Sequence, residues 1–211
     1  MRDLEGQIQE LLDRQAIFDC VQRYARGIDR DDVDLVASCY HPDAIDDHGF
    51  YVGPGRGLAE WAIAGHRGQL SGQHHITNHL VELDGDTAHS ETYFITIFRR
   101  GPGGLRGAID ALQGNGSVAG EDQGDLNGSV GIGSGRYIDR FERRDGEWRI
   151  AARVFIVETL VDATVAPMAA IERASSPFTR DLSDPSYRRP LTVSRRSAQE
   201  EHPPLRDPLR E

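Results

Sequence analysis

The amino-acid sequence predicts an α+β fold, in which a cone-shaped, curved and mostly antiparallel sheet (an α+β barrel) is covered by N-terminal helices. Three observations lead to this prediction. Apolar residues recur at helical spacing through much of residues 4–66. Residues 73–98 and 136–158 alternate in polarity on either side of an Asp-Gly pair, which is typical of β-hairpins. Helices followed by strands form the α+β class, and a curved sheet closed by helices leaves a conical cavity.

The first predicted helix covers residues 4–26. It is expected to end at Gly27, because glycine accepts the left-handed backbone found at helix ends. This end matters for Tyr24 and Asp29, whose side chains would lie roughly 140° apart around the axis of one continuous helix. With an end at Gly27, Asp29 lies on the exit turn and can reach the same pocket as Tyr24.

Two further helices and a strand pair are expected before the hairpins. Asp31 or Asp32 should cap a second helix, which Pro42 ends. Residues 44–52 have the pattern of a short strand pair, and a glycine-rich loop follows them. Residues 58–66 then form an amphipathic third helix that leads into the first hairpin.

Asp84-Gly85 and Asp145-Gly146 are strong signals for tight turns, so each hairpin is expected to reverse there. The last strand is apolar on both parities, which favours burial on both sides. Residues 1–165 are thus predicted to form one barrel domain. Residues 101–135 hold more than half of the chain's 23 glycines and are predicted to be an insertion loop. Residues 166–211, rich in proline, arginine and serine, should form an extended arm that wraps a neighbouring subunit or stays disordered.

The composition excludes several classes of protein. A formal net charge of −10 argues against a nucleic-acid partner, which requires a basic face. No apolar run is long enough to cross a bilayer, and the charged N-terminus lacks the apolar core of a secretory signal. Cys20 and Cys39 lie within apolar helical patterns and are expected to be buried free thiols. These features predict a cytoplasmic protein.

Four residues are candidates for the catalytic and substrate-binding groups of an active site. His74 stands near the start of a strand, where side chains point into the mouth of a cavity. A carboxylate such as Asp29 would fix the imidazole tautomer and leave its other nitrogen free to take a proton. Tyr24 could hydrogen-bond a substrate oxygen, and Arg153 on the last strand could hold a developing negative charge. Such a set suits proton abstraction next to a carbonyl, or elimination of water or halide.

These segments together resemble SnoaL-like proteins of the nuclear-transport-factor-2-like superfamily. Within it the chain looks most similar to the scytalone dehydratase, hexachlorocyclohexane dehydrochlorinase and bile-acid 7-alpha-dehydratase group. The segments that carry the resemblance are Arg23-Tyr24-Ala25-Arg26-Gly27-Ile28-Asp29, His74-His75-Ile76-Thr77-Asn78, Asp84-Gly85-Asp86-Thr87-Ala88, Tyr137-Ile138-Asp139-Arg140-Phe141 and Arg144-Asp145-Gly146-Glu147-Trp148-Arg149-Ile150.

The resemblance implies an enzyme that works without metal or organic cofactor, often as a trimer. In this resemblance, Asp29 and His74 match the catalytic acid and histidine of the family. Tyr24 matches a polar residue five positions before the acid, and Arg153 matches an arginine on the last hairpin. The predicted function is therefore that of a lyase or isomerase acting on a small hydrophobic cyclic substrate, in a homo-oligomer (trimer or dimer). A polyketide-cyclase-like aldol closure, a non-catalytic binding protein and a dioxygenase accessory subunit remain alternatives.

The remaining candidates are aromatic or ionisable residues close to the predicted pocket. His75 should point to the face opposite His74, and a register error of one residue would exchange them. His75 and His79 share a strand face, but no cysteine or acid completes a tetrahedral set, so no metal site is predicted. Asp46 and Asp47 are assigned to a turn. The aromatic residues proposed to line the pocket are Tyr51, Trp61, Tyr93, Phe94 and Phe155.

Overall fold

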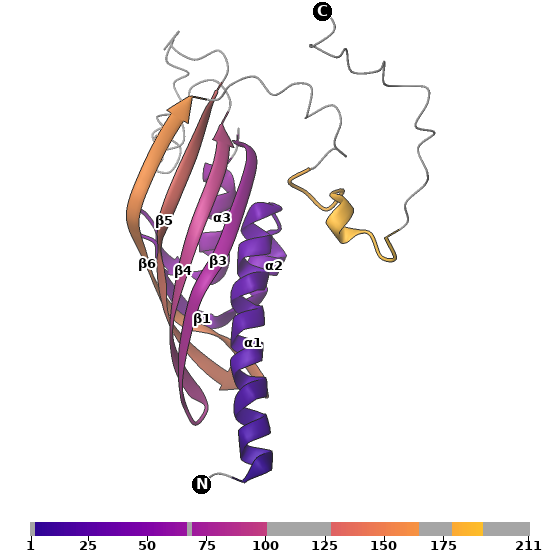
Figure 1. Ribbon diagram of the computed structural model, residues 1–211, viewed down its shortest axis with the longest axis vertical. Helices are drawn as coiled ribbons and strands as arrows, with labels where there is room; N and C mark the ends of the chain where they lie inside the picture. The colour runs from indigo at the N-terminus through magenta and orange to yellow at the C-terminus, as the bar shows by residue number, and fades with distance from the viewer. Residues whose placement is uncertain (1–2, 67–68, 101–127, 165–178, 192–211) are drawn as a thin grey trace, which may run out of the picture.

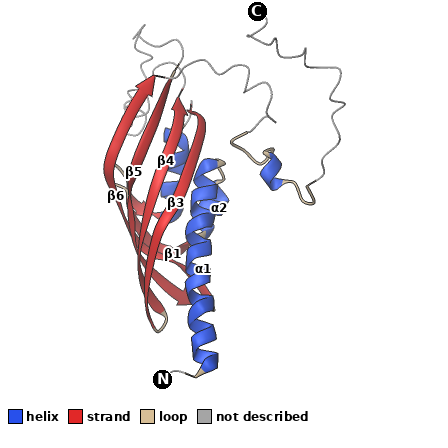
Figure 2. Cartoon of the chain, viewed as in Figure 1, coloured by secondary structure: helices blue, strands red, loops and turns tan. Residues whose placement is uncertain are grey.

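The computed structural model describes residues 3–66, 69–100, 128–164 and 179–191. It has one six-stranded curved sheet in the order β2-β1-β6-β5-β4-β3, with helices on one side (Figures 1 and 2). All neighbouring strands are antiparallel except β1 and β6, so the predicted α+β cone is confirmed. The helices and strands are α1 (Leu4–Asp29), α2 (Val33–Ser38), β1 (Tyr40–Asp47), β2 (Val52–Pro54), α3 (Gly55–Gly65), β3 (Gln69–Asp84), β4 (Thr87–Arg100), β5 (Ser129–Arg144) and β6 (Glu147–Thr164).

Helix α1 is longer than the sequence pattern predicts. It continues through Gly27 to Asp29, and Asp31 then reverses the chain with a positive φ of 52°. Gly27 instead allows α1 and α2 to pack closely, because a Cβ atom there would stand 2.6 Å from Val36 Cγ2 on α2. The predicted helix end at Gly27 is therefore wrong, because a glycine required for close helix contact has the same sequence signature as a terminal glycine.

The segment after α1 follows the prediction in part. The carboxylate of Asp32 caps α2 by accepting a hydrogen bond from the Leu35 backbone N–H at 3.0 Å, as predicted. Helix α2 ends at Ser38, and Pro42 already lies in β1, so the predicted second helix is too long. The strand pair β1–β2 and helix α3 are both present.

Both hairpins are confirmed. The β3–β4 turn has Gly85 at φ +59°, and the β5–β6 turn has Asp145 and Gly146 at φ 53° and 82°. These left-handed conformations explain the Asp-Gly pairs. Pairing of β3 with β4 puts His74 opposite Thr96.

Three alternating glycines form much of the inner face of β5. The predicted insertion loop over residues 101–135 is wrong for residues 129–135, which are strand, while residues 101–127 lie outside the described residues. A Cβ atom at Gly133 would stand 2.9 Å from Thr96 Oγ1, and one at Gly135 would stand 2.8 Å from Phe94 Cζ. One at Gly131 would overlap the guanidinium of Arg100. The three glycines thus allow Phe94, Thr96 and Arg100 of β4 to lie across β5, and all three of these side chains line a cavity above the sheet.

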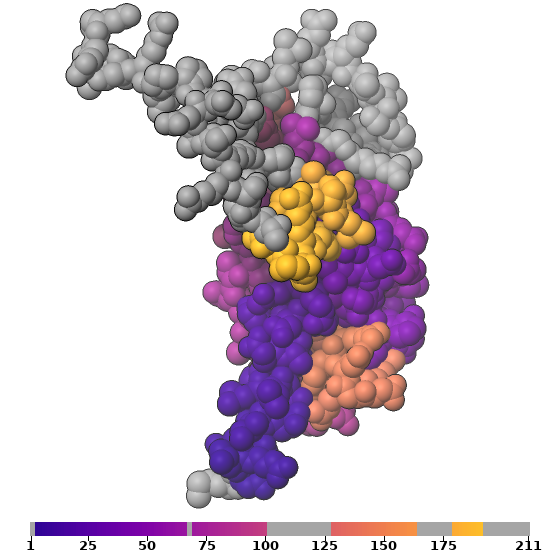
Figure 3. Space-filling model, turned by 90° about the vertical axis from the view of Figure 1, so that its right-hand side faces the viewer, coloured from indigo at the N-terminus to yellow at the C-terminus, as the bar shows by residue number. Residues whose placement is uncertain are grey.

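Part of the C-terminal arm packs on the helices of its own domain. Figure 3 shows residues 179–191, in yellow, against the helical side of the molecule. The Tyr187 hydroxyl donates to Asp32 Oδ2 at 2.9 Å, and the guanidinium of Arg26 lies 4.5 Å from the Tyr187 ring centre. This stretch of the predicted arm therefore packs on its own domain, and residues 166–178 and 192–211 lie outside the described residues. Among the helices that the structure describes, none is both long and apolar enough to span a membrane.

Candidate active site

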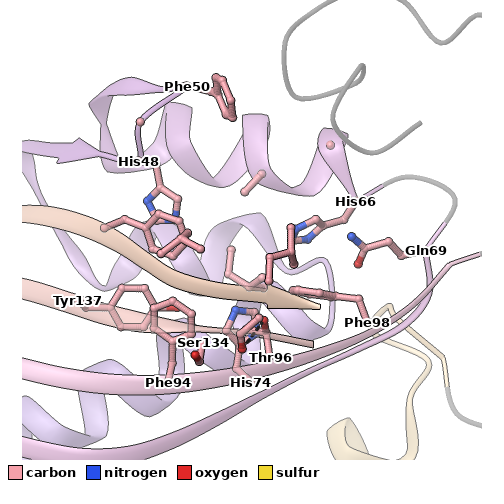
Figure 4. A pocket seen from close by; sticks show the side chains of 18 of the residues that line it. His48, Phe50, His66, Gln69, His74, Phe94, Thr96, Phe98, Ser134 and Tyr137 are labelled. Carbon is pink, nitrogen blue, oxygen red and sulfur yellow. Dashed lines mark hydrogen bonds between the residues drawn. The ribbon is translucent and has the colours of Figure 1, made fainter. Parts of the chain in front are cut away.

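A cavity of about 650 Å³ opens between the inner face of the sheet and helices α1 and α3. Its walls are mostly apolar and aromatic, as expected for a small-molecule site. Figure 4 shows His48 and Tyr137 at one end, His66, Gln69 and Phe98 at the other, and His74 between them. Polar side chains are therefore spread along a mainly apolar space.

His74 and Asp29 are in direct contact. Asp29 Oδ1 lies 2.6 Å from His74 Nδ1, and Asp29 Oδ2 accepts the backbone N–H of His74 at 3.0 Å. A carboxylate only accepts, so the neutral imidazole carries its proton on Nδ1 and keeps Nε2 as the proton acceptor. The side chains are 7% and 16% exposed, which shields the pair from bulk water. His75 is exposed and does not line the cavity, so the register expected for this strand is confirmed.

A second histidine–aspartate pair lies in the same cavity and was missed by the sequence prediction. His48 Nδ1 is 2.6 Å from Asp46 Oδ1, and the hydroxyl of Tyr40 donates to Asp46 Oδ2 at 2.5 Å. The His48 ring stacks on Phe155 with a centroid distance of 4.0 Å. Asp46 is fully buried in β1, so its assignment to a turn is wrong. Strand alternation was an available signal, since residues two apart share a face.

Two buried phenols complete the wall. Tyr24 and Tyr137 both line the cavity, and their rings meet edge to face at 5.5 Å. Burial raises the pKa of both hydroxyls, so each stays protonated and can donate a hydrogen bond to a substrate oxygen. The structure thus brings Tyr24 into the cavity, where the sequence placed it.

Arg153 lies behind these phenols and does not line the cavity. Its guanidinium forms a bidentate pair with Asp139, at 2.6 Å from Nε and 2.7 Å from Nη2, and both side chains are fully buried. The rings of Tyr24 and Tyr137 lie 4.3 Å and 4.1 Å from its Cζ atom. Burial disfavours the charged guanidinium, yet the charge and hydrogen bonds of Asp139, together with Tyr40 and Tyr24, outweigh this effect and raise the pKa of Arg153. Direct contact of Arg153 with substrate is therefore not supported.

The other predicted aromatic residues divide into two groups. Trp61, Phe94 and Phe155 line the cavity. Tyr51 does not, because it stacks on Trp61 at 5.6 Å and donates its hydroxyl to the Pro54 carbonyl at 2.8 Å. Tyr93 lies on the outer face of the sheet, 37% exposed, with the Arg136 guanidinium 5.7 Å from its ring. The predicted contacts of Tyr51 and Tyr93 with the cavity are wrong.

His66 at the end of α3 is a further titratable group that the sequence prediction left unassigned. Burial lowers the pKa of its imidazole to about 3, and the nearby charges of Arg180 and His74 add to this effect. Arg180 also holds the ends of two helices together, donating to the carbonyl of Ile28 and that of His66 at 3.3 Å each. His66 is therefore neutral at physiological pH.

His66 is expected to make the folded state less stable as the pH falls. An imidazole with a lowered folded pKa binds its proton first in the unfolded chain, below about pH 6.5. The free energy of unfolding should fall by at most about 1.4 kcal/mol per pH unit from this group, down to about pH 3. Urea unfolding near pH 7 and near pH 5 should show a smaller acid loss for His66→Gln than for the wild type. Equal losses would contradict the assignment.

Among the described residues, no three histidine, cysteine, aspartate or glutamate side chains are grouped so that they could hold a metal ion. Cys20 and Cys39 are buried and free, as predicted, and each thiol donates to the backbone carbonyl of the other residue at 3.4 Å.

The structure is thus a cone-shaped α+β sheet that surrounds a mainly apolar cavity with a buried histidine–aspartate pair. The chain belongs to the SnoaL-like domain family, whose sequence profile matches residues 9–154. The family resemblance stated from the sequence is thus confirmed.

Solved structures support this assignment. A variant of Rv3472 from Mycobacterium tuberculosis, a protein of unknown function, is 29% identical over 76% of this chain and 79% of its own, with a TM-score of 0.52. A proposed scytalone dehydratase from Novosphingobium aromaticivorans is 16% identical over 77% and 97%, with a TM-score of 0.56. A type-three hexachlorocyclohexane dehydrochlorinase from Novosphingobium barchaimii is 17% identical over 76% and 99%, with a TM-score of 0.59. The last two structures show only that their fold is shared with this chain. A search of curated proteins returns no match.

Proposed function

We propose that this protein is a cofactor-independent lyase or isomerase in which His74 abstracts a proton from carbon in a hydrophobic cyclic substrate. The single observation that carries the proposal is the 2.6 Å contact between His74 Nδ1 and Asp29 Oδ1 inside an apolar cavity. Asp29 holds the tautomer that leaves Nε2 basic and stabilises the imidazolium once the proton has moved. The structural neighbours named as a dehydratase and a dehydrochlorinase have the same fold.

In the proposed reaction, Nε2 of His74 takes a proton from the carbon next to a carbonyl. The electron pair moves towards the carbonyl oxygen, where the O–H groups of Tyr24 and Tyr137 can stabilise the negative charge by hydrogen bonding. The enolate then expels a β-hydroxyl as water, or is reprotonated with a shifted double bond. His48, oriented by Asp46, is a candidate proton donor to the leaving group from another part of the wall.

A bicyclic β-hydroxy ketone of the tetralone type tests this function. Its dehydration yields a fluorescent naphthol, so turnover can be followed continuously without knowledge of the natural substrate. The wild type should accelerate the loss of water over the buffer rate, and it should incorporate solvent deuterium at the carbon next to the carbonyl of recovered substrate. Absence of both across a series of such ketones would contradict proton abstraction by this cavity.

We further propose a homo-oligomer, trimer or dimer, that forms through the outer face of the sheet. Strand pairing brings apolar side chains of β4, β5 and β6 onto this face, and Ile95, Ile132 and Val154 are 40%, 42% and 47% exposed. Such a patch on a monomer is a common mark of an interface. Light scattering should give a multiple of the chain mass, and Ile95→Glu should shift it to that of a monomer. A monomeric wild type would contradict the proposal.

A further inference from the structure

The end of the cavity near His66 contains polar atoms that no partner satisfies. In the part of the chain that the structure describes, His66 Nδ1, Gln69 Oε1 and Arg100 Nε are all buried without a hydrogen bond. All three residues line the cavity (Figure 4 shows His66 and Gln69). Buried polar atoms normally find partners, so a cluster of unsatisfied ones beside a cavity indicates that a ligand supplies them.

Arg100 is the charged member of this cluster. It lies on the inner face of β4 with its side chain 7% exposed, and its Cζ atom is 5.8 Å from the Phe98 ring centre. The His66 ring lies on Phe98 as well, at 5.6 Å. Among the described residues, Asp162 is the carboxylate that approaches Arg100, at 3.4 Å from Nη1, and its side chain is 32% exposed. Within the described ranges, this long contact is the one hydrogen bond from the five guanidinium donors, and Nε is buried without a partner.

The neighbouring strand β5 has no side chain at the position where this guanidinium lies. Gly131 on β5 lies directly against Arg100 Nη1 and Nη2, where any side chain would overlap them. Gln69 is the Cα partner of Arg100 across β3 and β4, so its amide stands beside the same site. Its Oε1 is an acceptor, and a half-turn of the amide presents the NH2 group to an anion instead. Burial lowers the pKa of Arg100, and Asp162 opposes this shift only in part. An anion that enters this end of the cavity would therefore pair with a guanidinium that is already desolvated and held in place.

We propose that the cavity takes an apolar cyclic carboxylic acid, whose carboxylate is bound by Arg100 beside Gln69 and His66. The guanidinium fork matches the two carboxylate oxygens, and the apolar body would extend along Phe98 towards His74. This inference rests on the proposed function only in taking the cavity as the substrate site.

The test compares two probes of equal size, naphthoate and neutral naphthamide, by isothermal titration calorimetry near pH 7. The wild type should bind naphthoate about tenfold or more tightly than naphthamide. Arg100→Gln should reduce this preference to within about threefold. Gly131→Ala keeps the charge but displaces the guanidinium, so it should also lower the preference. Arg56→Gln removes an exposed arginine outside the cavity and should leave the preference unchanged.

Three results would overturn the proposal: equal binding of both probes by the wild type, full preference in Arg100→Gln, or no binding of naphthoate. Circular dichroism of each variant verifies the fold, and Gly131→Ala provides the test if Arg100→Gln does not fold. His74→Ala should keep the preference for naphthoate while losing dehydration of the tetralone-type ketone. Failure of the carboxylate site and failure of the proposed catalysis are thereby distinguishable.

Discussion

His74→Ala is expected to lower kcat for dehydration of the tetralone-type ketone by about a thousandfold, since a positioned general base contributes on the order of 10²–10⁴ in rate. The substitution removes the nitrogen base that Asp29 orients, and the pair is shielded from bulk water that could take over its role. KM should change little, because the apolar walls that bind the ring remain. Continuous fluorescence of the naphthol product measures both constants.

Asp29→Asn should lower kcat by a similar factor, but for a different physical reason. A carboxamide can turn its N–H₂ towards Nδ1, which would favour the tautomer that carries the proton on Nε2 and has no base in the cavity. The double variant should be no slower than the slower single variant, because the two residues act as one unit.

His75→Ala is the matched control for these variants. His75 is the next residue in β3 but lies on the exposed face, outside the cavity. It should retain wild-type kcat. If His74→Ala also retains wild-type kcat, the His74–Asp29 pair is not the base, and another group, such as His48, takes the proton.

The fold was predictable because its strongest signals are local. Asp84-Gly85 and Asp145-Gly146 specify left-handed turns whatever the rest of the chain does, and both hairpins reverse there. Glycine elsewhere was ambiguous. The periodicity before Gly27 could not reveal that Val36 of α2 would press against it, and the alternating glycines of β5 have the composition of a loop. Close approach between elements is tertiary information.

The site was predictable where residues fell on matched positions of a family, and less so where burial decided the outcome. Asp29 and His74 meet as expected, although Asp29 reaches His74 from the last turn of a longer helix. Tyr93 could have been rejected from the sequence, because it alternates with Phe94 and only one of them faces inward. The depth of Arg153 behind the phenols depends on the packing of three elements, which no spacing rule reports.

Asp139→Asn is expected to have the largest effect on stability, lowering the free energy of unfolding by about 3–5 kcal/mol. Asp139 and Arg153 are fully buried, and the bidentate contact is what compensates the guanidinium charge. Without it, Arg153 keeps a buried charge between the rings of Tyr24 and Tyr137. Urea unfolding followed by circular dichroism measures the change.

An exposed pair provides the control for the same substitution. Asp34 lies 2.7 Å from Arg56, but their side chains are 86% and 59% exposed, so Asp34→Asn should leave the unfolding midpoint unchanged. A combined Asp139→Leu and Arg153→Met variant removes both charges and should recover much of the stability lost in Asp139→Asn. If Asp139→Asn unfolds at the wild-type midpoint, the ion pair does not support the phenols. The cavity wall formed by Tyr24 and Tyr137 would then have to be held by packing of the aromatic rings alone.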